Sequence, residues 1–275
     1  MMLIAQLTDL HVRPLGVPAY RVAETNMLTE RALRALAALR LAPDAVVVTG
    51  DLTDCGLPAE YALLAGMLAR VPMPVYSIPG NHDRREAMIA HLQGTRHADG
   101  FVQYVVDDLP VRLVMLDTVV PGAGHGELCA RRLEWLDAAL AAAPGQPTMV
   151  CMHHPPFACG IGHMDAIALR HPSRFAAIIA RHRQVERILC GHHHRPVVAR
   201  VAHAVASICP SVAHQVELDL QPGAAGAFVL EPPAYQLHRW TAETGIVSHT
   251  ALVESYPGPF PFLEDPDYPG QASFV

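Results

Sequence analysis

The chain has 275 residues, of which 51% are hydrophobic and only 17% are charged. This length and composition suit one large domain with a thick core and exclude a disordered protein. The net charge of −6 provides no basic surface for nucleic acid or for an anionic membrane. No apolar stretch is long enough to span a bilayer, and the first residues lack the cationic region of a signal peptide. We therefore expect a soluble, cytoplasmic protein without nucleic-acid or membrane partners.

The reactive side chains narrow the possible chemistry further. Six cysteines in a chain of this length do not make a disulfide scaffold. No C-x-x-C pair is present, which argues against a thiolate zinc site. Cys151 and Cys190 lie in apolar runs and are expected to be buried, whereas Cys55, in a Gly/Pro loop, is expected to be exposed and has no assigned role. All 20 basic residues are arginine, which excludes P-loop and lysine-nucleophile chemistry. The informative excess is histidine, with 17 residues.

The first third of the chain alternates strands and helices. A short apolar strand at residues 3–7 is followed by helical spacing of apolar residues over 23–41 and by a β-branched strand at 45–49. The order strand, helix, strand predicts a parallel βαβ unit. Pro58 opens a second helix through residue 70, and a third strand follows at 75–78.

The middle of the chain continues this pattern. We expect a short helix at 84–92, paired strands at 101–106 and 111–117, an amphipathic helix at 130–143 and a buried strand at 148–152.

The last part of the chain is richer in strands. A helix at about 172–183 leads into a strand at 187–190, and hairpin strands are expected beyond it at 197–201, 205–209, 212–218, 235–240 and 246–253. The tail from Tyr256 holds prolines and aromatics without a regular period. It is expected to lie over the surface or over a partner subunit.

Metal-capable side chains follow five separate strand ends. They are Asp9 with His11, Asp51, Asn81, His153, and His192 with His194. In α/β sheets ligand sites form at the carboxyl ends of the strands, so these side chains should converge; Asp9 and His11, two apart in an extended segment, should project to the same side. Seven nitrogen and oxygen ligands are too many for one tetrahedral zinc and fit two ions that share a carboxylate, for which Asp51 is the natural bridge.

Three further residues lie beside these ligands in the sequence. His154 and His193 should point away from the ligands along an extended chain and support them rather than coordinate. Asp83 fits either a supporting role in the site or a helix N-cap, and we favour the cap. Gly50 lacks the Cβ that would crowd the turn before Asp51, so an ion could approach the backbone there.

These motifs resemble those of a known family. The segments Asp9-x-His11, Gly50-Asp51, Gly80-Asn81-His82-Asp83, His153-His154-Pro155-Pro156 and Gly191-His192-x-His194 are similar, in order, to the motifs of calcineurin-like metallophosphoesterases. Within that family, the chain most resembles class III cyclic nucleotide phosphodiesterases and bacterial glycerophosphodiesterases.

The resemblance implies a fold and a domain organisation. The fold would be a four-layer α/β sandwich of two mixed β-sheets flanked by helices, with a small cap or dimerisation segment. Residues 1–195 would form the catalytic domain, 196–253 a hairpin-rich segment that completes the core and forms the cap, and 254–275 a tail on the surface.

The resemblance also implies roles for the site residues. Asp9, His11, Asp51 and His194 would hold one metal ion, and Asp51, Asn81, His153 and His192 would hold the other. The metals could be iron, manganese, cobalt or zinc, because Asp, Asn and His suit all four. A hydroxide bridging the ions would attack phosphorus in line, and His82 would assist the departing oxygen.

The implied activity is hydrolysis of small phosphodiesters, either 3′,5′-cyclic nucleotides or glycerophosphodiesters. A phosphomonoesterase or nuclease on the same scaffold, and a metal-binding scaffold without turnover, remain alternatives, although the acidic charge balance disfavours a nuclease. Tyr20, His163 and His214 are candidates for the pocket wall, with packing or solvated-loop roles as the other possibility. The apolar composition and the tail favour a homo-oligomer, a dimer or higher.

Overall fold

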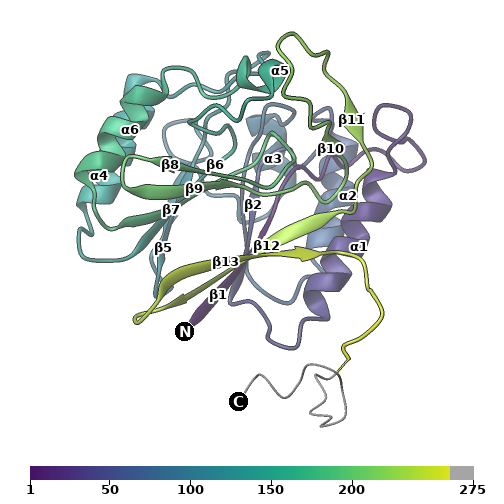
Figure 1. Ribbon diagram of the computed structural model, residues 1–275, viewed down its shortest axis with the longest axis horizontal. Coiled ribbons are helices and arrows are strands. Elements are labelled where there is room, and N and C mark those ends of the chain that lie inside the picture. The colour runs from purple at the N-terminus through teal and green to yellow at the C-terminus, as the bar shows by residue number, and fades with distance from the viewer. Residues whose placement is uncertain (261–275) are drawn as a thin grey trace, which may run out of the picture.

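The computed structural model describes residues 1–260, so most of the expected tail, from residue 261 onward, lies outside the described residues. Two large sheets face each other (Figure 1). The first has the order β13-β12-β1-β2-β3, formed by β1 (Met2–Leu7), β2 (Ala45–Thr49), β3 (Val75–Ile78), β12 (Ala234–Thr241) and β13 (Gly245–Leu252). Strands β1, β2 and β3 are parallel, and β12 runs antiparallel to β1. The sheet is therefore mixed, and late residues of the chain complete it.

The second sheet is built from the middle of the chain. Its order is β4-β5-β6-β7-β9-β8, formed by β4 (Tyr104–Val106), β5 (Arg112–Leu116), β6 (Thr148–Met152), β7 (Val185–Cys190), β8 (Val197–Val201) and β9 (Ala204–Ile208). The four central strands β5, β6, β7 and β9 are parallel, while β4 and β8 pair antiparallel at the two edges.

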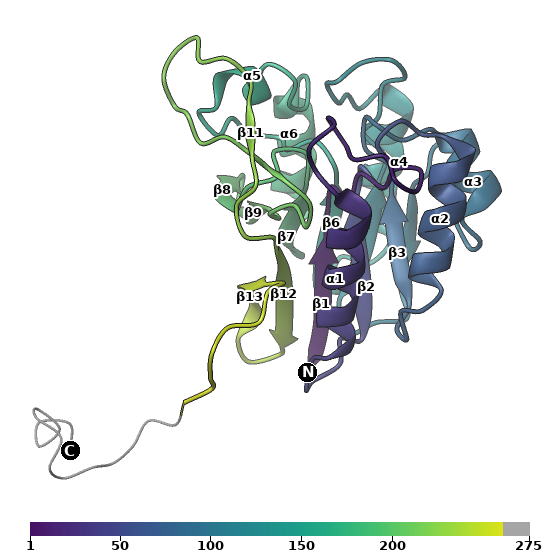
Figure 2. The ribbon, with the colours of Figure 1, turned by 90° about the vertical axis from the view of Figure 1, so that its right-hand side faces the viewer.

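Helices cover the outer face of each sheet (Figures 1 and 2). Apolar side chains of α1 (Thr25–Ala37), α2 (Pro58–Leu68) and α3 (Arg85–His91) pack against the first sheet. Those of α4 (Ala130–Ala141) and α6 (Pro172–Arg181) pack against the second. The short helix α5 (Gly162–Asp165) lies at one end of the sandwich. Among residues 1–260, no helix is both long and apolar enough to cross a bilayer.

The buried strands show why four layers form. In β2, Val46 and Val48 belong to the cluster under α1 and α2, whereas Ala45 and Val47 face the second sheet. In β6, Val150 and Met152 likewise pack under α4 and α6, and the alternate residues face the first sheet. Successive side chains on a strand point to opposite faces, so an apolar run supplies both the helix–sheet and the sheet–sheet cores. The predicted sandwich of two mixed sheets with helices outside is confirmed.

One expected strand is much shorter than predicted. The apolar pattern over 212–218 predicts a strand, but only β10 (Gln215–Val216) forms, paired with β11 (Phe228–Val229). The hydroxyl of Ser211 donates to the Asp9 carbonyl and accepts from the backbone N–H groups of Ala213 and His214. The chain therefore turns over the β1 loop, and only Gln215 and Val216 remain to pair with β11.

The parallel strands all deliver their carboxyl ends to one end of the sandwich. In Figure 2 the arrows of β1 and β3 point toward the end of the molecule that carries α5 and β11. The loops after β1, β2, β3, β6 and β7 therefore meet there, as expected for the ligand-binding edge of an α/β sheet.

A buried histidine in the first sheet makes stability depend on pH. Burial, together with the nearby Arg187, lowers the pKa of His238 to about 3. Below a pH of about 6.5 the unfolded chain takes up a proton that the folded chain refuses, so the free energy of unfolding rises with pH between about 3 and 6.5. His238→Gln should reduce that slope by at most about 1.4 kcal/mol per pH unit, measured by urea unfolding across this window. Equal slopes in variant and wild type would contradict the prediction, and His249→Gln, at an exposed position of β13, is the matched control.

Candidate metal centre

Four of the expected ligands come together at the carboxyl end of the first sheet. Ligand atoms of Asp9, His11, Asp51 and His194 all lie within 4.8 Å of one another, and all four residues are buried. His11 Nε2 lies 3.3 Å from His194 Nε2 and 3.7 Å from Asp51 Oδ2. His194 Nε2 lies 3.2 Å from Asp9 Oδ1. This donor set of two carboxylates and two imidazoles suits one transition-metal ion.

A second group of donors lies on the other side of Asp51. His153 Nε2 is 3.3 Å from Asp51 Oδ2 and 3.1 Å from Asn81 Oδ1. The His192 ring centroid lies 5.0 Å from that of His153. Asp51 Oδ2 therefore lies between the two groups, where one carboxylate can serve both.

In each expected imidazole ligand, one ring nitrogen contacts an oxygen atom of a neighbouring residue. These contacts, at 2.8 to 3.1 Å, join His11 Nδ1 to Asp54 Oδ1, His153 Nδ1 to the Thr49 carbonyl, His192 Nε2 to the Ile167 carbonyl, and His194 Nδ1 to the His214 carbonyl. In a neutral imidazole, the ring nitrogen that bonds an oxygen acceptor carries the proton, and the other nitrogen keeps a lone pair for a metal ion. The residues present therefore fit metal ions, because this pattern is typical of metal-binding histidines.

The backbone that carries these ligands is not extended. Five of the expected ligands have positive φ: Asp9 (53°), His11 (46°), Asp51 (47°), His192 (72°) and His194 (56°). The prediction that an extended segment aligns Asp9 with His11 is therefore wrong, although the two side chains do converge. Positive φ is costly for residues with a Cβ and persists where surrounding contacts fix it, as occurs at functional sites.

Two glycines make room for the ligands. A Cβ at Gly50 would collide with the His153 ring, and a Cβ at Gly80 would collide with the Asp51 carboxylate. The sequence predicts close approach of an ion to the backbone at Gly50, but the group that comes close is the imidazole of His153. Both glycines therefore permit side chains of different strand-end loops to converge.

Charge compensation holds the buried Asp51 ionised. Burial alone would raise its pKa, but His153, His82 and His11 lower the pKa of Asp51 well below its ordinary value. Conversely, burial opposes protonation of His153, whereas Asp51 raises the pKa of His153 to about 9. Cation binding requires an anionic carboxylate and a neutral imidazole, so a bound ion would replace the proton that Asp51 favours on His153.

Asp54 belongs to the site although none of the sequence motifs predicts it. Its carboxylate bonds His11 Nδ1, and its carbonyl lies 2.7 Å from His82 Nδ1. The His82 backbone N–H donates to Asp51 Oδ1 at 2.9 Å. Burial opposes the charged His82 ring, but Asp51 and Asp54 together raise its pKa. The signal for Asp54 was its place three residues after Asp51, on the same loop.

Asp83 is not a helix cap, so the favoured prediction is wrong. Arg84 occupies the N-cap of α3, without a side-chain cap bond. The buried Asp83 carboxylate instead accepts from the backbone N–H groups of Gly80, Leu52 and Thr53 at 2.9 to 3.1 Å, and from the Tyr61 hydroxyl at 2.9 Å. Burial and the charge of Asp51 raise its pKa to about 6. Asp83 thus ties the Asp51 loop to the Asn81 loop.

The two other neighbouring histidines differ from each other. His154 Nδ1 lies 2.8 Å from Thr118 Oγ1, and His154 Nε2 lies 3.2 Å from the Gly124 carbonyl, so both ring nitrogens are engaged outside the centre. His193 is also buried, but neither of its ring nitrogens has a hydrogen-bond partner.

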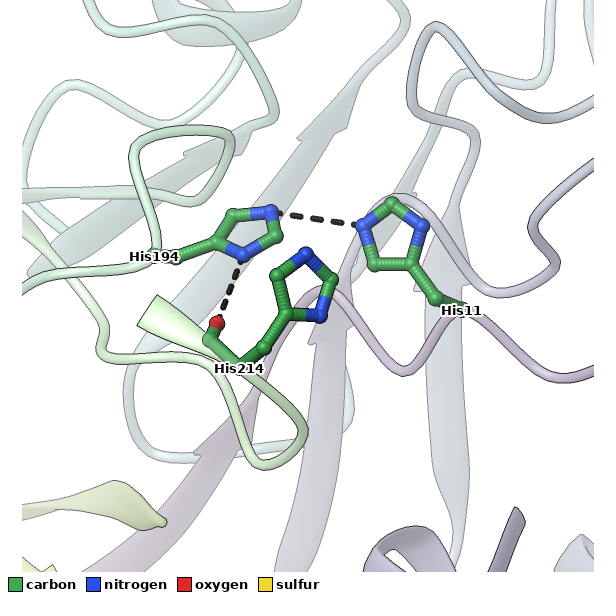
Figure 3. Close-up of side chains that lie close together, drawn as sticks. All are labelled: His11, His194 and His214. Carbon is green, nitrogen blue, oxygen red and sulfur yellow. Dashed lines mark hydrogen bonds between the residues drawn. The ribbon is translucent and has the colours of Figure 1, made fainter. Parts of the chain in front are cut away.

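A pocket of about 360 Å³ opens over the two groups, and its walls include Tyr20, His163 and His214 together with Phe228. The His214 ring lies beside those of His11 and His194 (Figure 3), with centroid separations of 5.1 and 4.6 Å. Burial and the two neighbouring imidazoles lower the pKa of His214 to about 2. A larger cavity of about 590 Å³, beside Tyr76 and Arg96, contains none of the expected ligands, so volume alone would misplace the site.

Fold and site together define a class: a four-layer α/β protein with Asp, Asn and His side chains clustered around Asp51 at the carboxyl ends of its strands. The family model "Calcineurin-like phosphoesterase" matches residues 2–196, and the chain belongs to this family. The glycerophosphodiester phosphodiesterase GpdQ of Enterobacter lignolyticus is 33% identical over 270 residues, which cover 96% of this chain and 95% of that protein.

Two further comparisons agree. The 3′,5′-cyclic adenosine monophosphate phosphodiesterase CpdA of Escherichia coli K12 is 31% identical over 192 residues, covering 70% of this chain and 69% of that protein. The crystal structure of a dimetal phosphatase from Danio rerio superposes with a TM-score of 0.64 over 92% of this chain and 99% of that one. At 15% identity, this last match shows a shared fold.

The hydrogen bonds of Asp83 lead to a stability prediction. Asp83→Ala removes the acceptor of three buried backbone N–H groups, each of which costs about 1–3 kcal/mol when unpaired. The free energy of unfolding should fall by at least about 3 kcal/mol in urea titrations. Glu86→Ala, in the first turn of α3, is the matched control for a helix-start effect. A loss below about 1 kcal/mol for Asp83→Ala would show that other groups hold the two loops together.

Proposed function

We propose that this protein is a dinuclear metal-dependent phosphodiesterase that hydrolyses small phosphodiesters, either 3′,5′-cyclic nucleotides or glycerophosphodiesters. The observation that carries the proposal is the position of Asp51 Oδ2, 3.3 Å from His153 Nε2 and 3.7 Å from His11 Nε2. A carboxylate shared in this way by two imidazole groups suits a pair of ions. The names of the relatives support the two substrate classes.

Under this proposal each ion has its own set of ligands. Asp9, His11, Asp51 and His194 would hold the first ion, and Asp51, Asn81, His153 and His192 the second. Iron, manganese, cobalt and zinc all accept such nitrogen and oxygen donors. When bound, two such ions polarise the phosphoryl oxygens and make a water molecule nucleophilic at neutral pH.

The chain's own residues would orient the substrate and handle the leaving group. The contact of His82 Nδ1 with the Asp54 carbonyl fixes the proton on Nδ1 and turns Nε2 toward the pocket. A protonated His82 would donate to the departing ester oxygen. Tyr20, His163 and His214 would contact the organic part of the substrate from the pocket wall.

We also infer the roles of the segments outside the sandwich. Residues 1–195 would form the catalytic unit, and 196–253 would complete the core through β12 and cap the pocket through β10 and β11. The side chains of Leu218, Leu220 and Leu230 are each more than half exposed. Because large exposed apolar side chains are typical of interfaces, this segment would join copies of the chain into a homo-oligomer.

A pair of variants separates metal binding from proton transfer. Asp51→Ala should lose bound metal and turnover together, because it removes the carboxylate shared by both ions. His82→Ala should keep the metal but lose about 10²–10⁴-fold in rate, the usual contribution of a general acid. Metal content by elemental analysis and turnover of bis(p-nitrophenyl) phosphate check both outcomes. Full activity in Asp51→Ala would overturn the assignment.

The activity itself is tested by comparing two esters. With Mn²⁺, Co²⁺, Fe²⁺ or Zn²⁺ added, bis(p-nitrophenyl) phosphate should be hydrolysed faster than p-nitrophenyl phosphate, since the proposed reaction is diester cleavage. A faster monoester reaction would instead support a phosphomonoesterase. Failure to hydrolyse either ester would support a scaffold without turnover. Cyclic AMP and glycerophosphoethanolamine then separate the two diester classes.

A further inference from the structure

A second group of potential ligands lies outside the expected set, where the loop around α5 meets the loop after β7. Cys159, Asp165 and His193 bring a thiol sulfur, a carboxylate oxygen and an imidazole nitrogen within 4.8 Å of one another. None of the three is an expected ligand of the two-ion centre. They come from two segments that the hydrophobic pattern of the sequence does not connect.

His193 is the unusual member of this group. Its side chain is fully buried, yet neither Nδ1 nor Nε2 makes a hydrogen bond. The Met164 carbonyl lies near the ring, but its position does not meet hydrogen-bond geometry with either ring nitrogen. A buried polar atom without a partner is costly, and native proteins rarely keep one without a ligand, a water molecule or a function.

The carboxylate of the group is already fixed in place. Asp165 Oδ1 accepts the Cys159 backbone N–H at 2.7 Å, and Asp165 Oδ2 accepts that of Gly160 at 2.9 Å. An ionised carboxylate has about four acceptor positions, so both oxygens keep lone pairs for another partner. The same two bonds hold the Cys159 backbone beside Asp165 and so keep its thiol near the group.

We propose that Cys159, Asp165 and His193 form a third, mononuclear metal site that binds zinc or a chemically similar divalent ion. Zinc binds thiolate sulfur at about 2.3 Å and imidazole or carboxylate at about 2.0–2.2 Å, which places tetrahedral ligand atoms roughly 3.3–3.6 Å apart. The ligand atoms lie at most 4.8 Å apart, so small side-chain rotations would bring them to the separations that zinc requires. Two donors of the group are nitrogen and oxygen, and the thiolate favours zinc over magnesium or calcium.

The absence of a C-x-x-C pair argued against a thiolate zinc site, but that rule covers only cysteines close in sequence. Here a single cysteine is joined by an aspartate six residues later and by a histidine from a separate loop. The convergence depends on the fold and leaves no spacing signature in the sequence.

The site would control the wall of the substrate pocket. The α5 loop carries His163, Met164 and Ile167, which line that pocket, and the Ile167 carbonyl bonds His192. An ion held by Asp165 and His193 would attach this loop to the loop that carries His192 and His194. Its function would be to position the pocket wall, separately from the chemistry of the two-ion centre.

The absorption spectrum of the cobalt-loaded protein tests this site separately from the two-ion centre. A cysteine thiolate bound to Co²⁺ gives a charge-transfer band in the near ultraviolet, and the expected two-ion centre contains no cysteine. Protein loaded with Co²⁺ should show this band, and Cys159→Ser should lose it together with one bound ion per chain. The matched control is Cys129→Ser, which removes a partly buried thiol at the start of α4 and should retain both.

A second variant guards against misfolding as an explanation. His193→Gln keeps Cys159 and should also lose the band, with a circular dichroism spectrum like that of the wild type. Absence of the band in cobalt-loaded wild type, or its persistence in Cys159→Ser, would overturn the third site. Neither result bears on the diesterase proposal, because turnover of bis(p-nitrophenyl) phosphate by the wild type is measured separately.

Discussion

The buried negative charge of Asp51 is the constraint on which the rest of the site depends. A carboxylate out of water is unstable unless charged or polar partners surround it. Here His11 and His153 lie on either side, and the His82 N–H donates to it. Those partners come from loops after β1, β6 and β3, so neutralising one charge requires three strand ends to meet. Packing of the two sheets and the shape of the centre are therefore linked through Asp51.

Much of this arrangement could be predicted from the sequence, because it follows from strand geometry. The run Ala45–Thr49 is apolar at every position but the last, which is typical of a strand buried on both faces, and the structure places it at the middle of three parallel strands. Parallel strands of one sheet deliver their ends to one edge, so Asp51 and Asn81 had to lie near each other, and β6 of the facing sheet brings His153 to the same end. Order and residue type sufficed for this much.

What could not be predicted depends on contacts between loops. The left-handed backbone of Asp9 and His11 is fixed by bonds from their N–H groups to the carbonyls of Gly50 and Asp51. Likewise, an aspartate just before a helix, such as Asp83, is typical of an N-cap, but two of the N–H groups that donate to it belong to a loop thirty residues earlier. Local propensity favours a cap, and tertiary hydrogen bonding overrides it.

The conformation of the loop after β7 depends both on the strand that precedes it and on its contacts with other loops. Three successive histidines follow Gly191, and the left-handed conformations of His192 and His194 turn those two rings toward the expected metal centre. The ring between them is left facing Cys159 and Asp165 on the α5 side. A regular strand would also place His193 on the face opposite to His192 and His194. However, an extended strand could not bend tightly enough for His194 to reach Asp9. The strained backbone thus allows one short loop to present donors to two neighbouring sites.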